Sequence, residues 1–214
     1  MQLAISPAAE REVPAAWKTA KRAIDVGLGS CLLVLASPIV AIAAIGIVCV
    51  TGGSPWFAQE RVGMDGRRFR MYKLRTMVRG AEEMRDELLH LNEIAGPVFK
   101  IRNDPRLHPL GGLLRRTSID ELPNLINVVA GHMSLVGPRP ALPCEVATYD
   151  SLAMRRLTVP QGVTCTWQIS GRSRVSFDEW MRLDNEYVDT WNPLGDLAII
   201  AKTIPAVIRR RGAH

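Results

Sequence analysis

The sequence predicts a predominantly helical α/β protein, with one catalytic unit attached to the membrane by a helical segment. Three observations lead to this class. The chain has an uncharged apolar run near its N-terminus, apolar residues at helical spacing over much of the remainder, and a single Asp-Gly turn between two short extended segments. Its 214 residues suffice for one domain of ordinary size together with the membrane segment.

The run from Val26 to Val50 contains no charged residue. It is long enough to cross a bilayer, because about 20 apolar residues suffice. Ser37 and Pro38 interrupt it near its middle. Pro38 removes a backbone donor, and the Ser37 hydroxyl can satisfy the carbonyl that this leaves free.

Basic residues flank this run on both sides. They are Lys18, Lys21 and Arg22 before it, and Arg61, Arg67, Arg68, Arg70, Lys73 and Arg75 after it. Because basic flanks favour the cytoplasmic face, a single span would place one flank on the disfavoured side. We therefore expect residues 17–50 to form a re-entrant membrane helix, broken at Ser37-Pro38 into two halves that enter and leave by the same face. A kinked single span is the main alternative, whereas a core helix or a cleaved signal peptide fits the run less well.

The remaining elements follow from local patterns. Residues 1–16 indicate a mobile leader, and residues 51–214 the cytoplasmic catalytic domain. Trp56–Arg61 and Phe69–Lys73 flank Asp65-Gly66, which predicts a β-hairpin. Residues 162–173 are expected to be rich in loops, with one short strand. Helices are predicted over residues 81–91, 112–129 with an interruption near Thr117-Ser118, 145–156, 177–191 and 194–211, the last suited to lie amphipathically on lipid headgroups.

Composition narrows the function classes. The net charge is +6 and the isoelectric point is near 9.5, and the basic residues lie beside apolar segments. This suits an anionic membrane surface and an anionic substrate, and no nucleic-acid-binding signature is present. Cys31, Cys49, Cys144 and Cys165 form no C-x-x-C pair, so a reducing, cytoplasm-facing location is expected. The four histidines lack metal-ligand spacing.

Adjacent carboxylates at Asp120 and Glu121 are the sharpest candidates for chemistry. One carboxylate can attack phosphorus to give an acyl-phosphate, while its neighbour holds a divalent cation. The spacing also fits a simple capping box from Ser118 to Glu121, in which Asp120 only favours a helix start. Spacing alone favours this structural interpretation.

Other candidates are ambiguous when taken singly. Lys73 and Arg75 can bind phosphate or extend along a membrane surface. Two prolines hold the backbone of Arg139 extended, in the Pro138-Arg139-Pro140 loop, where it can meet a nucleotide. Arg172 can contact an anionic ligand, and Asp184 fits an ordinary solvated acid on a helix surface.

Taken in order, these segments resemble a known family. The series comprises Lys21-Arg22-x-x-Asp25, Ser37-Pro38, Tyr72 to Met77, Ser118 to Pro123, Met133 to Pro140, and Gly162 to Arg172. It is similar to the bacterial sugar transferases that act as monotopic polyprenyl-phosphate phosphoglycosyl transferases. The similarity covers about Lys21 to Arg209, and it reverses the preference for a capping box. The family's Thr-Gly-Trp sequence is here Thr164-Cys165-Thr166-Trp167, which leaves that loop's geometry open.

The resemblance implies a specific reaction. Family members move a sugar 1-phosphate from a UDP-sugar to a polyprenyl phosphate, usually undecaprenyl phosphate, and release UMP. Asp120 matches the family's nucleophile, and Glu121 matches its partner at the Mg²⁺ site. Lys73, Arg115 and Arg172 match basic residues near the phosphates, Pro138-Arg139-Pro140 matches a motif at the uridine end, and Asp184 matches an acid in a Leu-Asp-x-x-Tyr segment.

The expected partners are therefore a UDP-sugar, polyprenyl phosphate and the lipid bilayer, with no nucleic acid, and a homodimer is left open. The expected location is the bacterial inner membrane, with the catalytic part facing the cytoplasm. The chain resembles the family's minimal form or an isolated catalytic domain. Two rival functions stay open from the residues: a metal-dependent phosphatase of lipid diphosphates, and a membrane scaffold without enzymatic activity.

Overall fold

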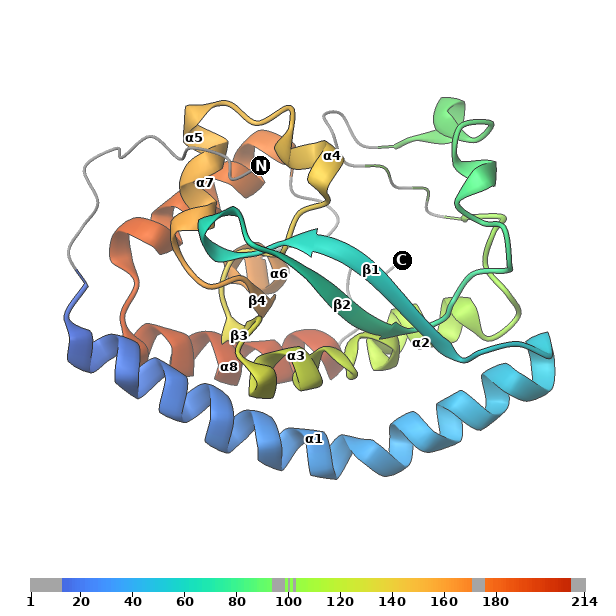
Figure 1. Ribbon diagram of the computed structural model, residues 1–214, viewed down its shortest axis with the longest axis horizontal. Helices are drawn as coiled ribbons and strands as arrows, with labels where there is room; N and C mark the ends of the chain where they lie inside the picture. The colour runs from blue at the N-terminus through green and yellow to red at the C-terminus, as the bar shows by residue number, and fades with distance from the viewer. Residues whose placement is uncertain (1–12, 94–98, 100, 102, 171–175, 209–214) are drawn as a thin grey trace.

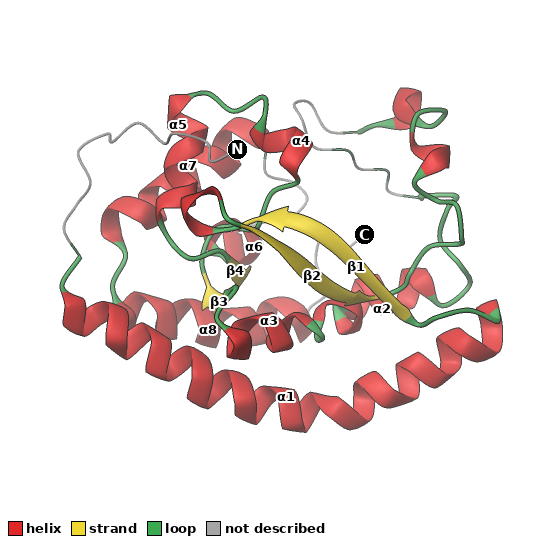
Figure 2. Cartoon of the chain, viewed as in Figure 1, coloured by secondary structure: helices red, strands yellow, loops and turns green. Residues whose placement is uncertain are grey.

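A single long helix, α1 (Ala15–Thr51), runs along one side of the molecule, and the other elements lie on its concave side (Figure 1). This computed structural model describes residues 13–93, 99, 101, 103–170 and 176–208. Within them the chain is mostly helical, as the sequence predicted, and it has two small sheets (Figure 2).

After α1 come the strands β1 (Trp56–Val62) and β2 (Arg68–Leu74), and the short helices α2 (Gly111–Thr117) and α3 (Asn124–Ala130). They are followed by β3 (Ser134–Val136), α4 (Pro143–Val146), α5 (Ser151–Met154) and β4 (Gly162–Thr164). The last helices are α6 (Thr166–Ser170), α7 (Phe177–Thr190) and α8 (Pro193–Ile208).

Helix α1 bends near its middle but is continuous through Pro38 (Figure 1). The expected break into two half-helices is therefore wrong in detail. Proline cannot donate to the carbonyl four residues earlier, which belongs to Val34. The Ser37 hydroxyl donates to that carbonyl at 2.8 Å, as the sequence predicted. The side-chain bond replaces the lost backbone bond, so the helix bends at the proline without ending there.

Both ends of α1 pack against the same body, while its middle is exposed. Ile47, near the C-terminal end, is fully buried with Leu74 and Leu114. Around the bend, by contrast, Val34 and Ile42 are 71% and 72% exposed. The helix is long and apolar enough to cross a membrane. Its bend lets one apolar surface face away from the body along the convex side.

The β-hairpin is confirmed, and its strands are one residue longer at each inner end than predicted. β1 pairs with β2 antiparallel from Trp56 opposite Leu74 to Val62 opposite Arg68. Asn127 of α3 then binds the backbone of β2, because its Oδ1 accepts from Tyr72 N at 3.2 Å and its Nδ2 donates to Arg70 O at 2.8 Å. These two hydrogen bonds hold α3, the helix that follows Asp120 and Glu121, against β2, the strand that carries Lys73.

The short strand expected within residues 162–173 is confirmed as β4, but residues 166–170 form helix α6 where a loop was expected. The parallel pairing of β4 with β3 was not predicted. β3 pairs with β4, with Ser134 opposite Gly162 and Val136 opposite Thr164. Gly162 approaches the backbone of Gly137 so closely that an added Cβ would lie 2.1 Å from Gly137 N. Only glycine fits such an approach. The pair fixes the start of the Pro138-Arg139-Pro140 loop, which follows β3 directly.

Two predicted helices are wrong. Residues 81–91 form turns with two short 3₁₀ segments, Glu83–Arg85 and Leu89–Leu91. Leu89 and Leu91 stay 52% and 41% exposed, so the segment buries little apolar surface against the body to stabilise a helix. Residues 145–156 divide among α4, α5 and a 3₁₀ segment, Arg155–Thr158, since Asp150 caps a new helix through Ala153 N. The expected interruption near Ser118 and the helix over 177–191 are confirmed. Ala15 and Ala16 belong to α1, while residues 1–12 of the expected leader and Arg209 to Arg211 lie outside the described residues.

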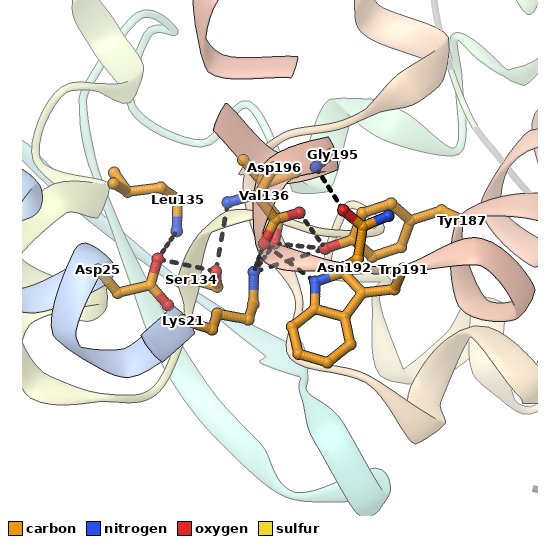
Figure 3. A network of polar contacts seen from close by, with 10 residues as sticks. All are labelled: Lys21, Asp25, Ser134, Leu135, Val136, Tyr187, Trp191, Asn192, Gly195 and Asp196. Carbon is orange, nitrogen blue, oxygen red and sulfur yellow. Dashed lines mark hydrogen bonds and ion pairs between the residues drawn. The ribbon is translucent and has the colours of Figure 1, made fainter. Parts of the chain in front are cut away.

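A buried polar network joins the start of α1 to β3 and α8 (Figure 3). Lys21 Nζ lies 2.6 Å from Asp196 Oδ2 and donates to the Val136 carbonyl at 2.8 Å. Tyr187 and Trp191 also donate to the Asp196 carboxylate, at 2.8 and 3.0 Å.

Two neighbouring charged residues of α1, Asp25 and Arg22, also hydrogen-bond to the protein body. Asp25 accepts from the Ser134 hydroxyl and from Leu135 N, both at 2.9 Å. Arg22 donates to the carbonyls of Val128 and Val129 at the end of α3, both at 2.7 Å. Of Lys18, Lys21 and Arg22, the last two therefore bind the protein body. Lys18 is exposed, and its side chain makes no polar contact with another described residue.

We expect Lys21→Met to lower the free energy of unfolding by about 3 kcal/mol, because it leaves the Asp196 charge buried with neutral donors only. Lys18→Met is the matched control on the same helix, and its effect should stay within about 0.5 kcal/mol. Thermal unfolding in detergent, followed by circular dichroism, measures both. Equal shifts for the two variants would contradict a structural role for the buried pair.

Candidate active site

The two candidate carboxylates lie on a short 3₁₀ turn, Ile119–Glu121, between α2 and α3. Ser118 ends α2 in the left-handed conformation, with φ of +58°, and its amide donates to the Arg115 carbonyl. In this conformation the Ser118 side chain makes no capping bond. The capping-box interpretation is therefore wrong. A non-glycine residue held at positive φ stores strain, and such strain clusters at functional sites.

Glu121 is held between two cations. Its Oε1 accepts from Lys73 Nζ at 2.7 Å and from Arg139 Nη1 at 3.3 Å. Burial raises the pKa of the Glu121 carboxyl, but the charges of Lys73 and Arg139 and their hydrogen bonds outweigh burial and hold the pKa well below its usual range. Glu121 is therefore a permanent anion at neutral pH.

Asp120 is 7% exposed, and no described residue hydrogen-bonds to its carboxylate. Burial, and then the adjacent Glu121 charge, raises the pKa of Asp120 to about 6, against the lowering effects of Lys73, Arg115 and Arg139. The side chain is thus ionised at neutral pH yet poorly solvated, and it accepts no hydrogen bond from a described residue. Those are the properties of an available oxygen nucleophile.

Arg115 comes from α2, one turn before the dyad. Its Nε donates to the Thr76 hydroxyl at 3.0 Å, which orients the guanidinium from the segment that follows β2. Burial, outweighing the nearby Asp120 charge, lowers the pKa of Arg115. Since no described residue occupies its terminal nitrogens, this side chain can receive an anion such as a phosphate.

The Pro138-Arg139-Pro140 loop is fixed through three successive carbonyls. The Pro138 carbonyl accepts from Gly162 N at 2.9 Å. The Arg139 carbonyl accepts from Arg156 Nη2 at 2.7 Å, and the Pro140 carbonyl accepts from Arg61 Nη1 at 3.1 Å. Prolines lack amide hydrogens, so carbonyl bonds are the main way to anchor this backbone. The anchoring directs the Arg139 side chain towards Glu121.

Asp184 lies behind this loop and is fully buried, contrary to its interpretation as a solvated surface acid. Its Oδ2 is 2.8 Å from Arg156 Nη2, the nitrogen that also binds the Arg139 carbonyl. Burial raises the pKa of Asp184 to about 6 despite the opposing Arg156 charge. The acid therefore acts on the site through Arg156 and Arg139, three contacts away from Glu121.

The structure brings together Lys73, Arg115, Asp120, Glu121 and Arg139. It does not add Arg75, which instead donates to the carbonyls of Ser54 and Trp56 at the turn between α1 and β1. Arg172 lies outside the described residues.

Sequence reasoning missed three residues of the site: Arg61, Arg156 and Asn124. Arg61 was counted only as a flanking charge, yet burial and the nearby Arg139 lower its pKa to about 10. Arg156 was placed at the end of a predicted helix, with no residue nearby in sequence to indicate that it is buried. Asn124 follows the dyad and Pro123 in the chain, and this closeness in sequence was the only indication that it belongs to the site.

A divalent cation fits the donor set only with help from a substrate. Among the described residues, no group of three or more His, Cys, Asp or Glu side chains could hold a metal ion. Asp120 and the Oε2 atom of Glu121 offer hard oxygen ligands that no described residue hydrogen-bonds. Mg²⁺ is commonly bound by one or two carboxylates together with substrate phosphates, so the pair suits that mode.

Comparisons with known proteins find relatives over most of this chain. A family model described as "Bacterial sugar transferase" matches residues 16–210. The exopolysaccharide production protein ExoY of Rhizobium meliloti (strain 1021) is 40% identical over 199 residues, which cover 91% of this chain and 88% of ExoY.

Two longer relatives match over the same part of the chain. The galactosyl transferase CpsE of Streptococcus agalactiae is 43% identical over 195 residues, covering 91% of this chain and 43% of CpsE. The undecaprenyl-phosphate galactose phosphotransferase of Salmonella typhimurium is 40% identical over 198 residues, covering 91% of this chain and 41% of that protein. The chain thus spans most of ExoY and less than half of the other two.

Proposed function

The chain belongs to the bacterial sugar transferase family, and we propose that it transfers a sugar 1-phosphate from a UDP-sugar to undecaprenyl phosphate, with release of UMP. The reaction would be the first membrane step of a polysaccharide or glycoconjugate pathway, at the cytoplasmic face of the bacterial inner membrane. The names of the Salmonella protein and of the UDP-glucose:undecaprenyl-phosphate glucose-1-phosphate transferase of Escherichia coli, which is 33% identical, support the lipid acceptor.

One observation carries the proposal: the buried Asp120 carboxylate has no hydrogen-bonding partner among the described residues, and lies in the field of Lys73, Arg115 and Arg139. The two substrates carry several negative charges, and their phosphates must approach a carboxylate. Cations arranged around that carboxylate offset the repulsion.

In the first step, an Asp120 oxygen attacks the β-phosphorus of the UDP-sugar. A phosphorus–oxygen bond to Asp120 forms as the bond to the α-phosphate oxygen breaks, and UMP leaves with that electron pair. The sugar phosphate is then an acyl-phosphate ester of Asp120. Arg115 and Arg139 stabilise charge on the phosphates, and Lys73 keeps Glu121 oriented beside them.

In the second step, a phosphate oxygen of undecaprenyl phosphate attacks the same phosphorus. The bond to Asp120 breaks, which restores its carboxylate and yields the undecaprenyl diphosphate sugar. Departure of UMP before the lipid attacks means that the site need not hold both negatively charged substrates at once. Mg²⁺, held by Glu121 and a substrate phosphate, would neutralise charge on the diphosphate.

The shape of α1 supports a re-entrant arrangement in the membrane. Both ends of the helix pack on the body that carries the dyad, through Lys21 and Asp25 at one end and Ile47 at the other. A helix that crossed the bilayer would place these ends on opposite faces. Exposed apolar side chains lie near the bend, so insertion of that convex part would hold Asp120 close to headgroup depth.

Single cysteines at Ala16 and Gly53, in a background without the four native cysteines, test this topology. We expect a membrane-impermeant thiol reagent to label both from the cytoplasmic face of oriented vesicles. Labelling from opposite faces would show a single span instead.

The pKa of Asp120 gives the reaction a defined pH dependence. The nucleophile must be ionised, so kcat/KM should fall about tenfold per pH unit below about pH 6. Glu121→Gln removes the neighbouring negative charge and lowers the Asp120 pKa, which moves this acidic limb of the profile to lower pH in the residual activity. A limb that stayed at the same pH in Glu121→Gln would assign the titration to another group.

UMP release from a panel of UDP-sugars, measured with undecaprenyl phosphate and Mg²⁺ in detergent, tests the proposed reaction. We expect UMP to form with at least one sugar and to depend on the protein. Phosphate release from lipid diphosphates without UMP would favour the phosphatase. The absence of any sugar-dependent label on the protein, together with tolerance of substitutions at Asp120 and Glu121, would favour the scaffold.

A further inference from the structure

A small cavity lies beside the Glu121 carboxylate. Its volume is about 10 Å³, close to the smallest size at which a protein cavity holds one water molecule. Three polar side chains line it, those of Glu121, Asn124 and Arg139, and its other walls include Met71 and Met133. A buried water needs two to four polar partners, and these three residues meet that requirement.

Asn124 is the unexplained member of this group. It is 3% exposed, and no described residue donates a hydrogen bond to its Oδ1. Asn127, one turn later on α3, uses both atoms of its amide to bind β2. The fold therefore accounts for one buried asparagine of α3 and leaves the other directed to the site. A buried amide oxygen without a donor is unfavourable unless a water, an ion or a ligand supplies one.

We propose that Asn124 is a positioning residue, which holds an ordered water between its amide oxygen, the Glu121 carboxylate and the Arg139 guanidinium. A water molecule donates two hydrogens and accepts others. It can therefore donate to Asn124 Oδ1 and to Glu121, and accept from Arg139. Glu121 has an oxygen to offer, because Lys73 and Arg139 both bind Oε1.

The inference rests on the proposed function, since the bridge would keep Glu121 and Arg139 oriented while phosphate is transferred. Lys73 and Arg139 restrain only one oxygen of Glu121. The water bridge would restrain the other, and would fix the rotation of the carboxylate about its axis. Loss of a group that orients an active-site residue typically costs about 10- to 100-fold in activity.

Two substitutions at this position separate positioning from folding. Asn124→Leu has similar size but cannot bind the water, so we expect kcat/KM to fall about 10- to 100-fold, while the unfolding temperature stays the same or rises. Asn124→Asp keeps an acceptor but adds a negative charge near Glu121 and Asp120. Its carboxylate oxygen can still accept from the water, so this variant should recover part of the kcat/KM that Asn124→Leu loses. Both are measured in the full chain in detergent, with a UDP-sugar and undecaprenyl phosphate.

Asn185→Leu is the matched control. Asn185 is also buried, and its Oδ1 also lacks a donor among the described residues, but it belongs to α7 and does not line the cavity. This variant should lose stability, because it loses the hydrogen bonds to the Leu152 and Met181 carbonyls, and it should keep the wild-type kcat/KM.

Unchanged kcat/KM in Asn124→Leu, or no recovery of kcat/KM in Asn124→Asp relative to Asn124→Leu, would overturn the positioning role. The proposed function would stand in that case if the wild type still releases UMP and forms the sugar-phosphate adduct. A wild type that does neither would overturn both.

Discussion

Replacement of Asp120 by asparagine should abolish sugar-phosphate transfer, with a fall in kcat of at least about 10³-fold. An amide has a similar shape but does not attack phosphorus. The described residues provide no other carboxylate with the same properties, because Glu121 is bound on one oxygen by Lys73 and Arg139. The fold should be unaffected, since no described residue hydrogen-bonds to the Asp120 carboxylate.

Intact mass spectrometry measures the step directly. Wild-type protein incubated with the UDP-sugar alone should gain the mass of one sugar phosphate, and Asp120→Asn should gain none. Asp65→Asn is the matched control, because Asp65 lies in the hairpin turn at positive φ, which asparagine also adopts readily. Full turnover in Asp120→Asn, or robust turnover of the wild type without any adduct, would rule out the covalent role.

The second large effect concerns the buried pair Arg156–Asp184. Both side chains are 1% exposed. Arg156→Met therefore leaves Asp184 in the interior without its cation, either as a buried charge or protonated. We expect the free energy of unfolding to fall by about 4 kcal/mol at about pH 8. The loss should be smaller at about pH 5, because Asp184, whose pKa burial has already raised to about 6, can then become neutral by binding a proton.

The sign of this pH dependence follows from the direction of the shift. A carboxyl whose pKa is higher in the folded than in the unfolded state stabilises the fold most below its unfolded pKa, and that contribution is lost as the pH rises through about 6. Removal of Arg156 raises the pKa of Asp184 further. Urea titrations at the two pH values test this, and an equal loss at both would contradict it.

The double variant Arg156→Met/Asp184→Leu separates stability from activity. Replacement of a buried ion pair by apolar residues is often neutral for stability, so much of the lost stability should return. Activity should not return, because the Arg139 carbonyl still lacks its donor from Arg156. Recovery of activity together with stability would show that the pair serves folding alone.

Local patterns predicted the elements whose determinants lie close together in the chain. The apolar run indicated α1, Asp65-Gly66 indicated the hairpin, and Ser37 was correctly paired with the carbonyl that Pro38 leaves free. The prediction over residues 81–91 was wrong, because helix propensity does not sustain a short helix whose leucines stay exposed instead of packing on the body.

The active site shows the limit of spacing as a guide. From spacing alone, Ser118 to Glu121 favoured a helix cap, and only the resemblance to a family favoured catalysis. The left-handed conformation of Ser118 decides against the cap. It depends on where α2 and α3 pack, which no four-residue pattern encodes.

The sequence by itself therefore determined the long apolar helix, the hairpin, and the family to which the chain belongs. Tertiary structure alone decided the partners of the charges: Lys73 meets Glu121 across 48 positions, and Lys21 meets Asp196 across 175. The physical reason is that secondary structure depends on neighbours within a few residues, whereas burial and ion pairing depend on distances in space. Whether a carboxylate is a solvated acid, a buried ion or a nucleophile follows from those distances.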